Sequence, residues 1–177
     1  MRKFFRSIFI VLLVLGIFNG YTHTLSSMYH IKYGQEKYIS NYLKKTITNN
    51  NLKTPTDISD WLLQNITYTY DKEIHNKYDY WQTPIETVEL KTGDCEDYAI
   101  LSGELLKEIG VKSVLVGLQT SLTKSGHGIC IFKYNSETYS ILDCGNLKET
   151  PYRTIREIVV KEYKAYPIYF AMKTGGK

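Results

Sequence analysis

The sequence predicts an α+β fold in which one long buried helix packs against an antiparallel sheet, and three features support this. Residues 95–109 carry apolar side chains at helical spacing, and four segments of strand character follow, separated by polar or glycine-containing turns. The chain has 177 residues, of which 43% are hydrophobic and 16 are tyrosine. This composition can build a substantial core, so it excludes an intrinsically disordered chain.

The central helix has recognisable signals at both ends. Asp94 is a favourable N-cap residue, Asp97 stands where the acid of a capping box lies, and Gly110 supplies a C-terminal stop. Between these ends the large apolar residues are three or four positions apart and form one stripe: Tyr98, Leu101, Leu105 and Ile109. The stripe predicts that the helix faces the core along its whole length.

Two further helices and an extended segment are expected before the central helix. Residues 35–47 have apolar side chains at roughly helical spacing and predict a surface helix, which the polar stretch 49–55 ends. A second helix is expected to begin at Thr56, with acids in its first turn. Residues 66–71 alternate as a strand does, and Pro84 marks an ordered loop or the start of a short helix.

The region after the central helix predicts the sheet. Four segments have the alternation and the residue types of strands: 112–120, 127–134, 138–145 and 165–172. Residues 133–137 supply the turn of a hairpin between the second and the third of them. If that hairpin pairs in an even register, His127 and Asp143 project from the same face of the sheet. The isoleucines of the hairpin share that face, and Cys130 and Cys144 lie on the other.

Three residues whose side chains can cooperate in thiol chemistry occur in the order Cys95, His127 and Asp143. A cysteine at a helix N-terminus gains thiolate character from the exposed N–H groups and the helix dipole. A carboxylate beside an imidazole fixes its tautomer and stabilises the imidazolium. Taken singly, each residue also has a structural interpretation, as core filler, satisfied strand-end histidine or turn acceptor. Their joint order along a helix, a strand and a hairpin favours a Cys–His–Asp hydrolase.

The motifs around these residues resemble a known family. The run GDCEDYAILSGELLKEIG, followed by HGICIF and ILD, resembles the transglutaminase-like superfamily, whose fold is related to that of papain. The upstream sequence DYWQTPIETVELKTGDCEDYA is closer still to the bacterial transglutaminase-like cysteine proteinases. The resemblance extends over roughly residues 56–146 and is specific around Cys95. It implies a papain/transglutaminase-like fold with the nucleophile helix packed on the antiparallel sheet.

The resemblance also implies roles for individual residues. Cys95 would be the nucleophile, His127 its base and Asp143 the group that orients the imidazole. Members of the proteinase group act in the bacterial periplasm on surface adhesins and depend on calcium. The acids that flank the cysteine are implicated in that dependence, and Asp94 and Glu96 occupy the matching positions here.

The acids beside Cys95 need an explanation, because nearby carboxylates raise the pKa of a thiol and oppose the helix dipole. Asp94 and Asp97 are explained as helix caps, but that role does not require Glu96. A hard cation such as calcium, bound by Asp94 and Glu96, would neutralise the acids and allow the dipole and His127 to prevail. Solvated caps without any metal are the alternative.

The oxyanion of the reaction also needs hydrogen-bond donors. The backbone N–H of Cys95 is one donor expected on physical grounds, and Gln82 or Trp81 is expected to provide a second. The family often carries a small residue where Gln82 stands, so the second donor does not follow from the resemblance.

The N-terminus has the form of an export signal. Arg2, Lys3 and Arg6 precede an apolar run over residues 8–18, and we see no small-x-small cleavage site. Residues 1–20 are therefore expected to be either a signal peptide or a retained membrane anchor. In both cases the body of the protein lies outside the cytoplasm: secreted, periplasmic or anchored to the membrane and facing outward.

The net charge of the chain bears on the kind of partner that is expected, and the number of cysteines bears on disulfide and zinc sites. Of the 22 basic residues, 19 lie beyond the N-terminal segment together with 18 acids, which leaves a net charge of +1 and no basic stripe for nucleic acid.

Three cysteines is an odd number for an exported protein. Three free thiols are expected, with a Cys130–Cys144 disulfide as the alternative. No CxxC pair is present, which argues against a structural zinc site.

The expected organisation has three parts: residues 1–20, a helical or linker segment 21–54, and a transglutaminase-like catalytic domain 55–174. The predicted function is an exported cysteine protease that cleaves a peptide or isopeptide bond of a substrate at the cell surface or envelope, through a thioester. The alternatives are transglutaminase-type acyl transfer to an amine, cleavage of cell-wall peptide cross-links, and a non-catalytic binding module. A complete set of Cys, His and Asp positions counts against the binding module.

Overall fold

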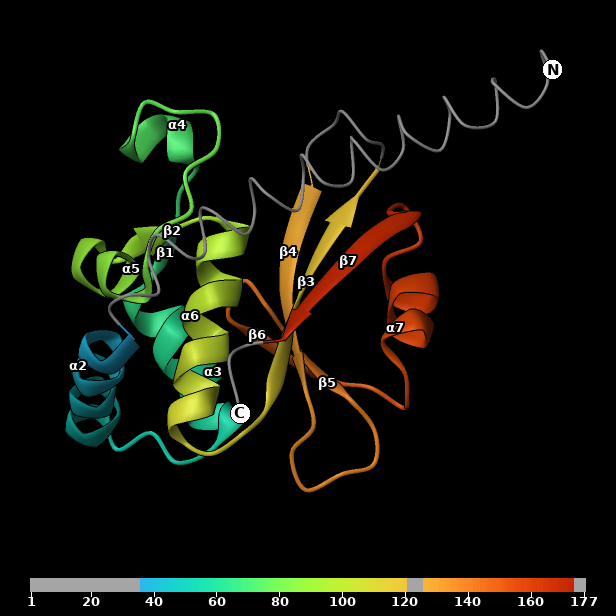
Figure 1. The fold of residues 1–177 in the computed structure, drawn as a ribbon, viewed down its shortest axis with the longest axis horizontal. Helices are drawn as coiled ribbons and strands as arrows, with labels where there is room; N and C mark the ends of the chain where they lie inside the picture. The colour runs from blue at the N-terminus through green and yellow to red at the C-terminus, as the bar shows by residue number, and fades with distance from the viewer. Residues whose placement is uncertain (1–35, 121–125, 174–177) are drawn as a thin grey trace, which may run out of the picture. The chain divides into compact units, whose positions relative to one another are not determined.

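The structure, a computed structural model, describes residues 36–120 and 126–173 (Figure 1). The predicted signal or anchor at residues 1–20 lies outside the described residues. Within the described residues, none of the helices combines the length and the apolar character needed to cross a membrane.

The described residues form helices and two sheets. The helices are α2 (Glu36–Asn50), α3 (Pro55–Asn65), α4 (Asp71–Ile74), α5 (Pro84–Leu90), α6 (Cys95–Glu108) and α7 (Ile155–Glu162). The strands are β1 (Thr67–Tyr68), β2 (Thr92–Gly93), β3 (Ser113–Gln119), β4 (Gly126–Phe132), β5 (Ser140–Asp143), β6 (Asn146–Glu149) and β7 (Ile168–Lys173). β1 and β2 form a short parallel pair, and the other strands form one antiparallel sheet in the order β6-β5-β4-β3-β7.

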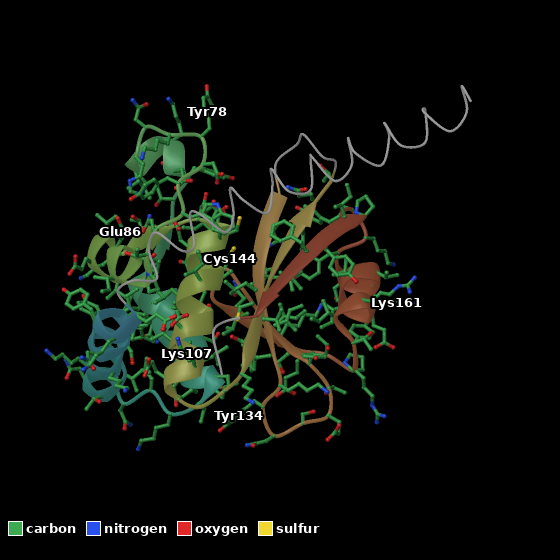
Figure 2. All side chains as sticks on the ribbon, viewed as in Figure 1. Tyr78, Glu86, Lys107, Tyr134, Cys144 and Lys161 are labelled. Carbon is green, nitrogen blue, oxygen red and sulfur yellow. The ribbon has the colours of Figure 1, made fainter. Side chains whose placement is uncertain are left out.

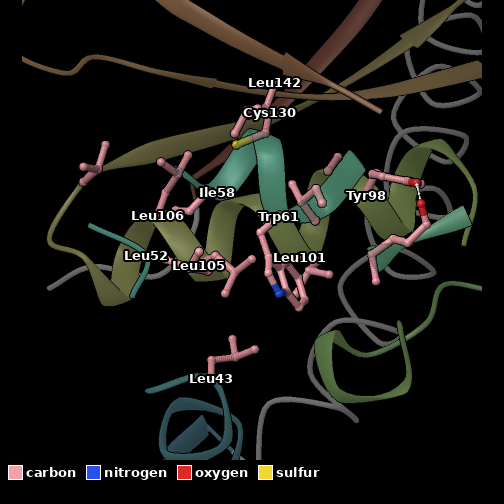
Figure 3. Packing of buried hydrophobic residues seen from close by; sticks show 14 of the residues in the cluster. Leu43, Leu52, Ile58, Trp61, Tyr98, Leu101, Leu105, Leu106, Cys130 and Leu142 are labelled. Atoms are coloured by element: carbon pink, nitrogen blue, oxygen red, sulfur yellow. Dashed lines mark hydrogen bonds between the residues drawn. The ribbon is translucent and has the colours of Figure 1, made fainter. Parts of the chain in front are cut away.

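The larger hydrophobic core lies between one face of this sheet and α6 (Figure 3). Leu101 and Leu105 of α6 are fully buried in it, together with Leu62 of α3 and Leu43 of α2. Burying one leucine side chain contributes about 1.5–3 kcal/mol, so this stripe is a main source of stability. The predicted core-facing stripe is confirmed, with Ile109 at its end only half-buried.

The second core lies on the opposite face of the sheet, under α7 (Figure 1). Ile158 and Val159 of α7 are buried against isoleucines of β4 and β5. α7 was not expected from the sequence, although Thr154 and Glu157 form a capping box at its start. With helices on both faces of an antiparallel sheet, the predicted α+β fold class is confirmed.

The register of the β4–β5 hairpin decides where the polar residues of the candidate site point. Ile131 pairs with Ile141 and Cys130 pairs with Leu142, which is the even register expected from the sequence. Because side chains alternate between faces, His127 and Asp143 share the face that carries the two isoleucines. Cys130 belongs to the core on the other face, as predicted.

Besides α7, other elements differ from the prediction, among them α3, β1 and β6. α3 begins at Pro55, with Thr54 rather than Thr56 at its start. The Thr54 hydroxyl accepts a hydrogen bond from the N–H of Asp57 at 3.2 Å, and proline suits the first helical position because no donor is needed there. The strand expected over residues 66–71 is only two residues long, because its partner β2 ends where α6 begins. β6 was not expected.

Candidate active site

Cys95 is the first residue of α6 and is 9% exposed. It follows Asp94 at the N-cap position, as the sequence predicted. Asp97, two residues further on, accepts hydrogen bonds from the backbone N–H of Asp94 at 3.2 Å and of Gln82 at 2.7 Å. Asp97 therefore both closes the start of the helix and ties the preceding loop to it, which fixes the position of Cys95.

A glycine allows β4 to lie against the first turn of α6. A Cβ atom on Gly128 would stand 3.0 Å from the Cα of Glu96 and 3.2 Å from the carbonyl oxygen of Cys95. These are backbone atoms, so a side chain at this position would force the helix away from the strand. The N–H of Gly128 also donates to the Cys95 sulfur, which favours the thiolate. His127 is the preceding residue of β4, so this contact brings its backbone beside the first turn of α6.

His127 and Asp143 form the pair that the sequence predicted. Nε2 of His127 lies 2.7 Å from Oδ1 of Asp143, which leaves Nδ1 as the nitrogen available to the thiol. The other carboxylate oxygen, Oδ2, accepts a hydrogen bond from the hydroxyl of Tyr163 at 2.7 Å. Burial opposes ionisation of Asp143, but the hydrogen bonds from His127 and Tyr163 outweigh it and hold the pKa of Asp143 below its usual value.

The thiol of Cys95 has a different partner. Its sulfur donates to Oε2 of Glu96 at 3.1 Å. Burial, followed by the charge of Glu96 and this hydrogen bond, raises the pKa of Cys95 well above its usual value. The effect of these groups exceeds the opposing hydrogen bond from Gly128. With Glu96 in this position the thiol keeps its proton, so the arrangement as it stands suppresses the nucleophile.

The carboxyl groups near the start of α6 are themselves perturbed. Burial and the neighbouring Asp94 raise the pKa of Glu96 to about 9, and burial raises the pKa of Asp97 to about 7. Burial also raises the pKa of Asp94 and of Asp71, the first residue of α4. Four acids thus share a buried site, and burial together with their mutual repulsion disfavours the ionised forms.

Two of these acids each have one buried carboxylate oxygen without a protein partner in the described part of the chain. Asp71 is 2% exposed and Asp94 is 9% exposed, and among the described residues Oδ1 of each has no hydrogen-bond partner. Carboxylate oxygens of Asp71, Asp94 and Asp97 lie within 4.8 Å of one another, and so do those of Asp71, Asp79 and Glu96. Closely spaced, unpartnered carboxylate oxygens are the ligands that a hard cation prefers. The donor set therefore fits calcium.

The two candidate oxyanion donors differ in their surroundings. The side chain of Gln82 is 1% exposed, and neither its Nε2 nor its Oε1 has a partner among the described residues. Trp81 is less buried, and its indole N–H donates to Oδ1 of Asp79 at 3.0 Å. Of the two, Gln82 has the amide that is not committed to another protein group.

The three cysteines are free, as expected, and no disulfide forms between Cys130 and Cys144. Cys130 is fully buried, and burial raises its pKa to about 12. Cys144 follows Asp143 in a turn with a positive φ of 46° and lies beside the N-terminal end of α6 (Figure 2). Burial, followed by the adjacent Asp143, raises its pKa to about 12. Both thiols are therefore poor nucleophiles.

Three contributors to this site were not singled out from the sequence: Tyr163, Asp71 and Gly128. Tyr163 lies 20 residues from Asp143 along the chain, at the end of a helix that was not expected. Asp71 stands 23 positions before Asp94 in the sequence, so only the fold brings the two together. Gly128 did carry a signal, because a glycine inside a strand often marks a close backbone approach.

Comparisons with known proteins identify the family to which the chain belongs. Residues 35–167 match the family described as Transglutaminase-like domain, which is more than half of the chain. A UPF0252 protein of Archaeoglobus fulgidus is 33% identical over 105 residues, which is 51% of this chain and 33% of that protein. A UPF0252 protein of Methanocaldococcus jannaschii is 31% identical over 121 residues, with coverage of 63% and 32%. The chain spans about a third of the length of the curated relatives it matches.

Solved structures give more distant similarities. LapG of Legionella pneumophila, treated with EGTA, is 22% identical with a TM-score of 0.43 and coverage of 64% of this chain and 62% of LapG. Calcium-bound LapG is 23% identical with a TM-score of 0.41 and coverage of 64% of both chains. A structure described as a TGase is 12% identical with a TM-score of 0.48 and coverage of 79% and 41%. Because these scores are below 0.5, the assignment of the fold rests on the family match and the layers described above.

Proposed function

Because the chain belongs to the transglutaminase-like domain family, we propose that it is an exported thiol hydrolase that cleaves a peptide or isopeptide bond through a thioester on Cys95. The observation that carries the proposal is the His127–Asp143 pair, with 2.7 Å between Nε2 and Oδ1, on a strand whose next residue packs on the backbone of Cys95. A nucleophile, a base and an orienting carboxylate in this order are the parts that acyl transfer requires.

In the first half of the reaction Nδ1 of His127 takes the thiol proton of Cys95, because Asp143 holds Nε2. The sulfur attacks the carbonyl carbon of the scissile amide, a C–S bond forms, and the carbonyl π electrons move to oxygen. Collapse of this tetrahedral intermediate breaks the C–N bond, and the imidazolium gives its proton to the leaving amine. The product that remains is a thioester on Cys95.

In the second half water resolves the thioester. His127 takes a proton from the water, and the oxygen of that water attacks the thioester carbonyl. The C–S bond then breaks, and the proton returns from His127 to the sulfur. An amine in place of water would give transglutaminase-type transfer through the same steps. Which of the two enters depends on access to the thioester.

We propose that the oxyanion is held by the backbone N–H of Cys95 and the side-chain amide of Gln82. A buried amide without a partner costs about 1–3 kcal/mol, and such a group is tolerated where a ligand satisfies it during the reaction. The absence of any partner for the side-chain amide of Gln82 among the described residues supports this role. The engagement of Trp81 with Asp79 makes it the weaker candidate.

Calcium is the cofactor that we propose, with Asp94, Glu96 and Asp71 as the residues that would hold it. A bound divalent cation would supply the positive charge that neutralises these acids and removes Glu96 as the acceptor of the thiol proton. The unpartnered oxygens of Asp71 and Asp94 support this assignment. If no thermal stabilisation appears at millimolar calcium, the acids are solvated or protonated caps only.

The proposed substrate is a protein or peptide at the cell surface or envelope. The basic and apolar N-terminus supports export, and the near-neutral body gives no reason to expect nucleic acid. The N-terminal segment would hold the protein at the membrane if it is retained.

The test is site-resolved alkylation of the full-length protein by iodoacetamide between pH 4 and pH 9, with calcium or with chelator. An activated Cys95 reacts quickly below the ordinary thiol pKa of about 8.5, whereas the buried Cys130 serves as an internal control that stays slow. Loss of the reactivity with chelator and in His127→Ala would connect it to the cation and the base. If Cys95 is as slow as Cys130 under every condition, the hydrolase proposal is wrong and a binding module on this fold is favoured.

A further inference from the structure

The end of α7 brings a tyrosine to the predicted Cys–His–Asp set. Tyr163 is the C-cap residue of α7, and its backbone N–H donates to the carbonyl of Val159 at 3.1 Å. Its hydroxyl donates to Oδ2 of Asp143 at 2.7 Å. Burial and the hydrogen bond to Asp143 raise the pKa of Tyr163 above its usual value, so the hydroxyl stays a neutral donor.

This bond supplies a second, independent restraint on the carboxylate of Asp143. Oδ1 is used by His127 and Oδ2 by Tyr163, each at 2.7 Å. The side chain of Asp143 is 33% exposed, so with only one oxygen held it could rotate about its Cβ–Cγ bond and exchange with water. Two bonds from opposite sides fix the plane of the carboxylate and therefore the direction in which it meets the imidazole.

The placement of Tyr163 is itself fixed by the fold. α7 begins at a capping box formed by Thr154 and Glu157, and Ile158 and Val159 are buried in the second core. That core lies on the face of the sheet from which His127 and Asp143 project. The helix thus holds Tyr163 on the face of the sheet from which Asp143 projects.

The groups around the histidine come from several elements. His127 faces Asp143, the rings of Tyr163 and Tyr166 with ring centres each 6.2 Å away, and Cys144, whose sulfur lies within 4.8 Å of a ring nitrogen. Asp143 faces His127, Tyr163 and Cys144. Among the described residues no hydrogen bond joins the hydroxyl of Tyr166 to Asp143, so Tyr166 matches Tyr163 in distance to the histidine but not in this bond.

We propose that Tyr163 is a positioning residue that acts through Asp143 on His127, so that the site consists of four side chains rather than three. By holding the carboxylate ionised and in plane, Tyr163 stabilises the imidazolium that forms when Cys95 loses its proton. The inference rests on the proposed function, because the positioning matters only if His127 is the base for Cys95.

The experiment compares Tyr163→Phe with Tyr166→Phe in the full chain with calcium present, since both changes keep the ring and remove one hydroxyl. In Tyr163→Phe we expect the rate of Cys95 alkylation near pH 7 to fall about 5- to 10-fold, which corresponds to the net contribution of one typical hydrogen bond. Tyr166→Phe should leave this rate unchanged.

A double-mutant cycle separates positioning from a loss of packing. If Tyr163 acts through Asp143, the Tyr163→Phe change should have no further effect on the alkylation rate in an Asp143→Asn background. A packing defect would persist in that background and would appear as a lowered melting temperature, and that result would overturn the inference.

A second measurement does not require any reactivity of Cys95. Proton NMR of the His127 imidazole N–H that faces Asp143 should show a changed chemical shift and faster exchange with water in Tyr163→Phe, but not in Tyr166→Phe. If wild-type Cys95 is as slow as Cys130 but this difference is found, the hydrolase proposal fails and the coupling through Asp143 stands. If Cys95 is activated and the N–H signal is the same in all three proteins, the positioning role is wrong and the hydrolase proposal stands.

Discussion

The two sides of the candidate active site differ in how completely their charges are paired. On the base side, His127, Asp143 and Tyr163 are joined by hydrogen bonds of 2.7 Å, and the pKa of Asp143 is lowered. On the nucleophile side, the thiol of Cys95 donates to Glu96, and the pKa values of both groups are raised. One side already favours its charged form, whereas the other resists it.

This difference indicates which half of the site requires something from outside the chain. The carboxylate of Asp143 has a protein donor for each oxygen, so the fold alone can set its direction. Among the described residues, Asp71 and Asp94 near Cys95 each keep one carboxylate oxygen without a hydrogen-bond partner. A proton or a bound cation would complete that side, and under the proposed function it is the cation, because a cation would leave the thiol able to ionise.

The largest effect is expected from breaking the base side at its carboxylate. In Asp143→Asn the amide can donate to Nε2 of His127, which places the imidazole proton on Nδ1 and prevents it from taking the thiol proton. We expect Cys95 alkylation near pH 7 with calcium to fall at least about 100-fold. Asp60→Asn, at an exposed position of α3, is the control that should keep the wild-type rate. A change below twofold in Asp143→Asn would mean that the pair is structural.

The buried acids on the nucleophile side should make the stability of the folded protein depend on pH. The pKa of Glu96 is raised from 4.5 to about 9 and that of Asp97 from 3.8 to about 7. The folded state therefore binds more protons than the unfolded state between these limits. Its extra stability is complete below about pH 4 and is lost as the pH rises through 7 and then 9.

In chelator the melting temperature should fall by about 5–10 °C between pH 5 and pH 9. Glu96→Gln should flatten this slope, because the neutral amide has no charge to bury. Addition of 1 mM calcium at pH 8 should restore about 5–10 °C in the wild type and in Asp60→Asn but not in Asp71→Asn. A flat profile in chelator would show that the acids near Cys95 ionise without penalty.

A substitution at Gly128 should disrupt the contact between β4 and the first turn of α6, which joins the two sides. In Gly128→Ala the new methyl group meets backbone atoms of Glu96 and Cys95 at 3.0–3.2 Å, so α6 must move away from β4. We expect a loss of about 1–3 kcal/mol in the free energy of unfolding and a clear drop in Cys95 alkylation. Gly110→Ala is the control: its φ of 82° makes alanine strained, but it lies at the other end of α6 and should not slow alkylation.

The smallest effect is expected at the cap of α7. Thr154→Ala removes the hydroxyl that accepts from the N–H of Glu157 at 3.2 Å and should cost about 1 kcal/mol of stability in urea unfolding. Because α7 carries Tyr163, a two- to threefold loss of Cys95 alkylation should accompany it. Thr54→Ala, at the equivalent cap of α3, should cost similar stability and leave alkylation unchanged. Equal alkylation in the two variants would indicate that α7 does not influence the base side.

Local patterns were sufficient for much of the fold. The stripe from Tyr98 to Ile109 predicted the buried face of α6, because helical periodicity is encoded within a few turns. The even register of the β4–β5 hairpin followed from alternation and placed His127 and Asp143 on one face. α7 was not predicted, because it has only eight residues and its burial depends on the isoleucines of the sheet.

The chain of 177 residues by itself determined the order of Cys95, His127 and Asp143 and the elements that carry them, since caps, periodicity and turns are short-range properties. Only the tertiary structure decided which groups surround them. Asp71 reaches the acids of α6 from a separate helix, and Tyr163 reaches Asp143 from the end of α7, on the face of the sheet away from α6. Protonation and hydrogen bonding depend on distances of a few ångströms between segments far apart in sequence, and those distances exist only once both cores have packed.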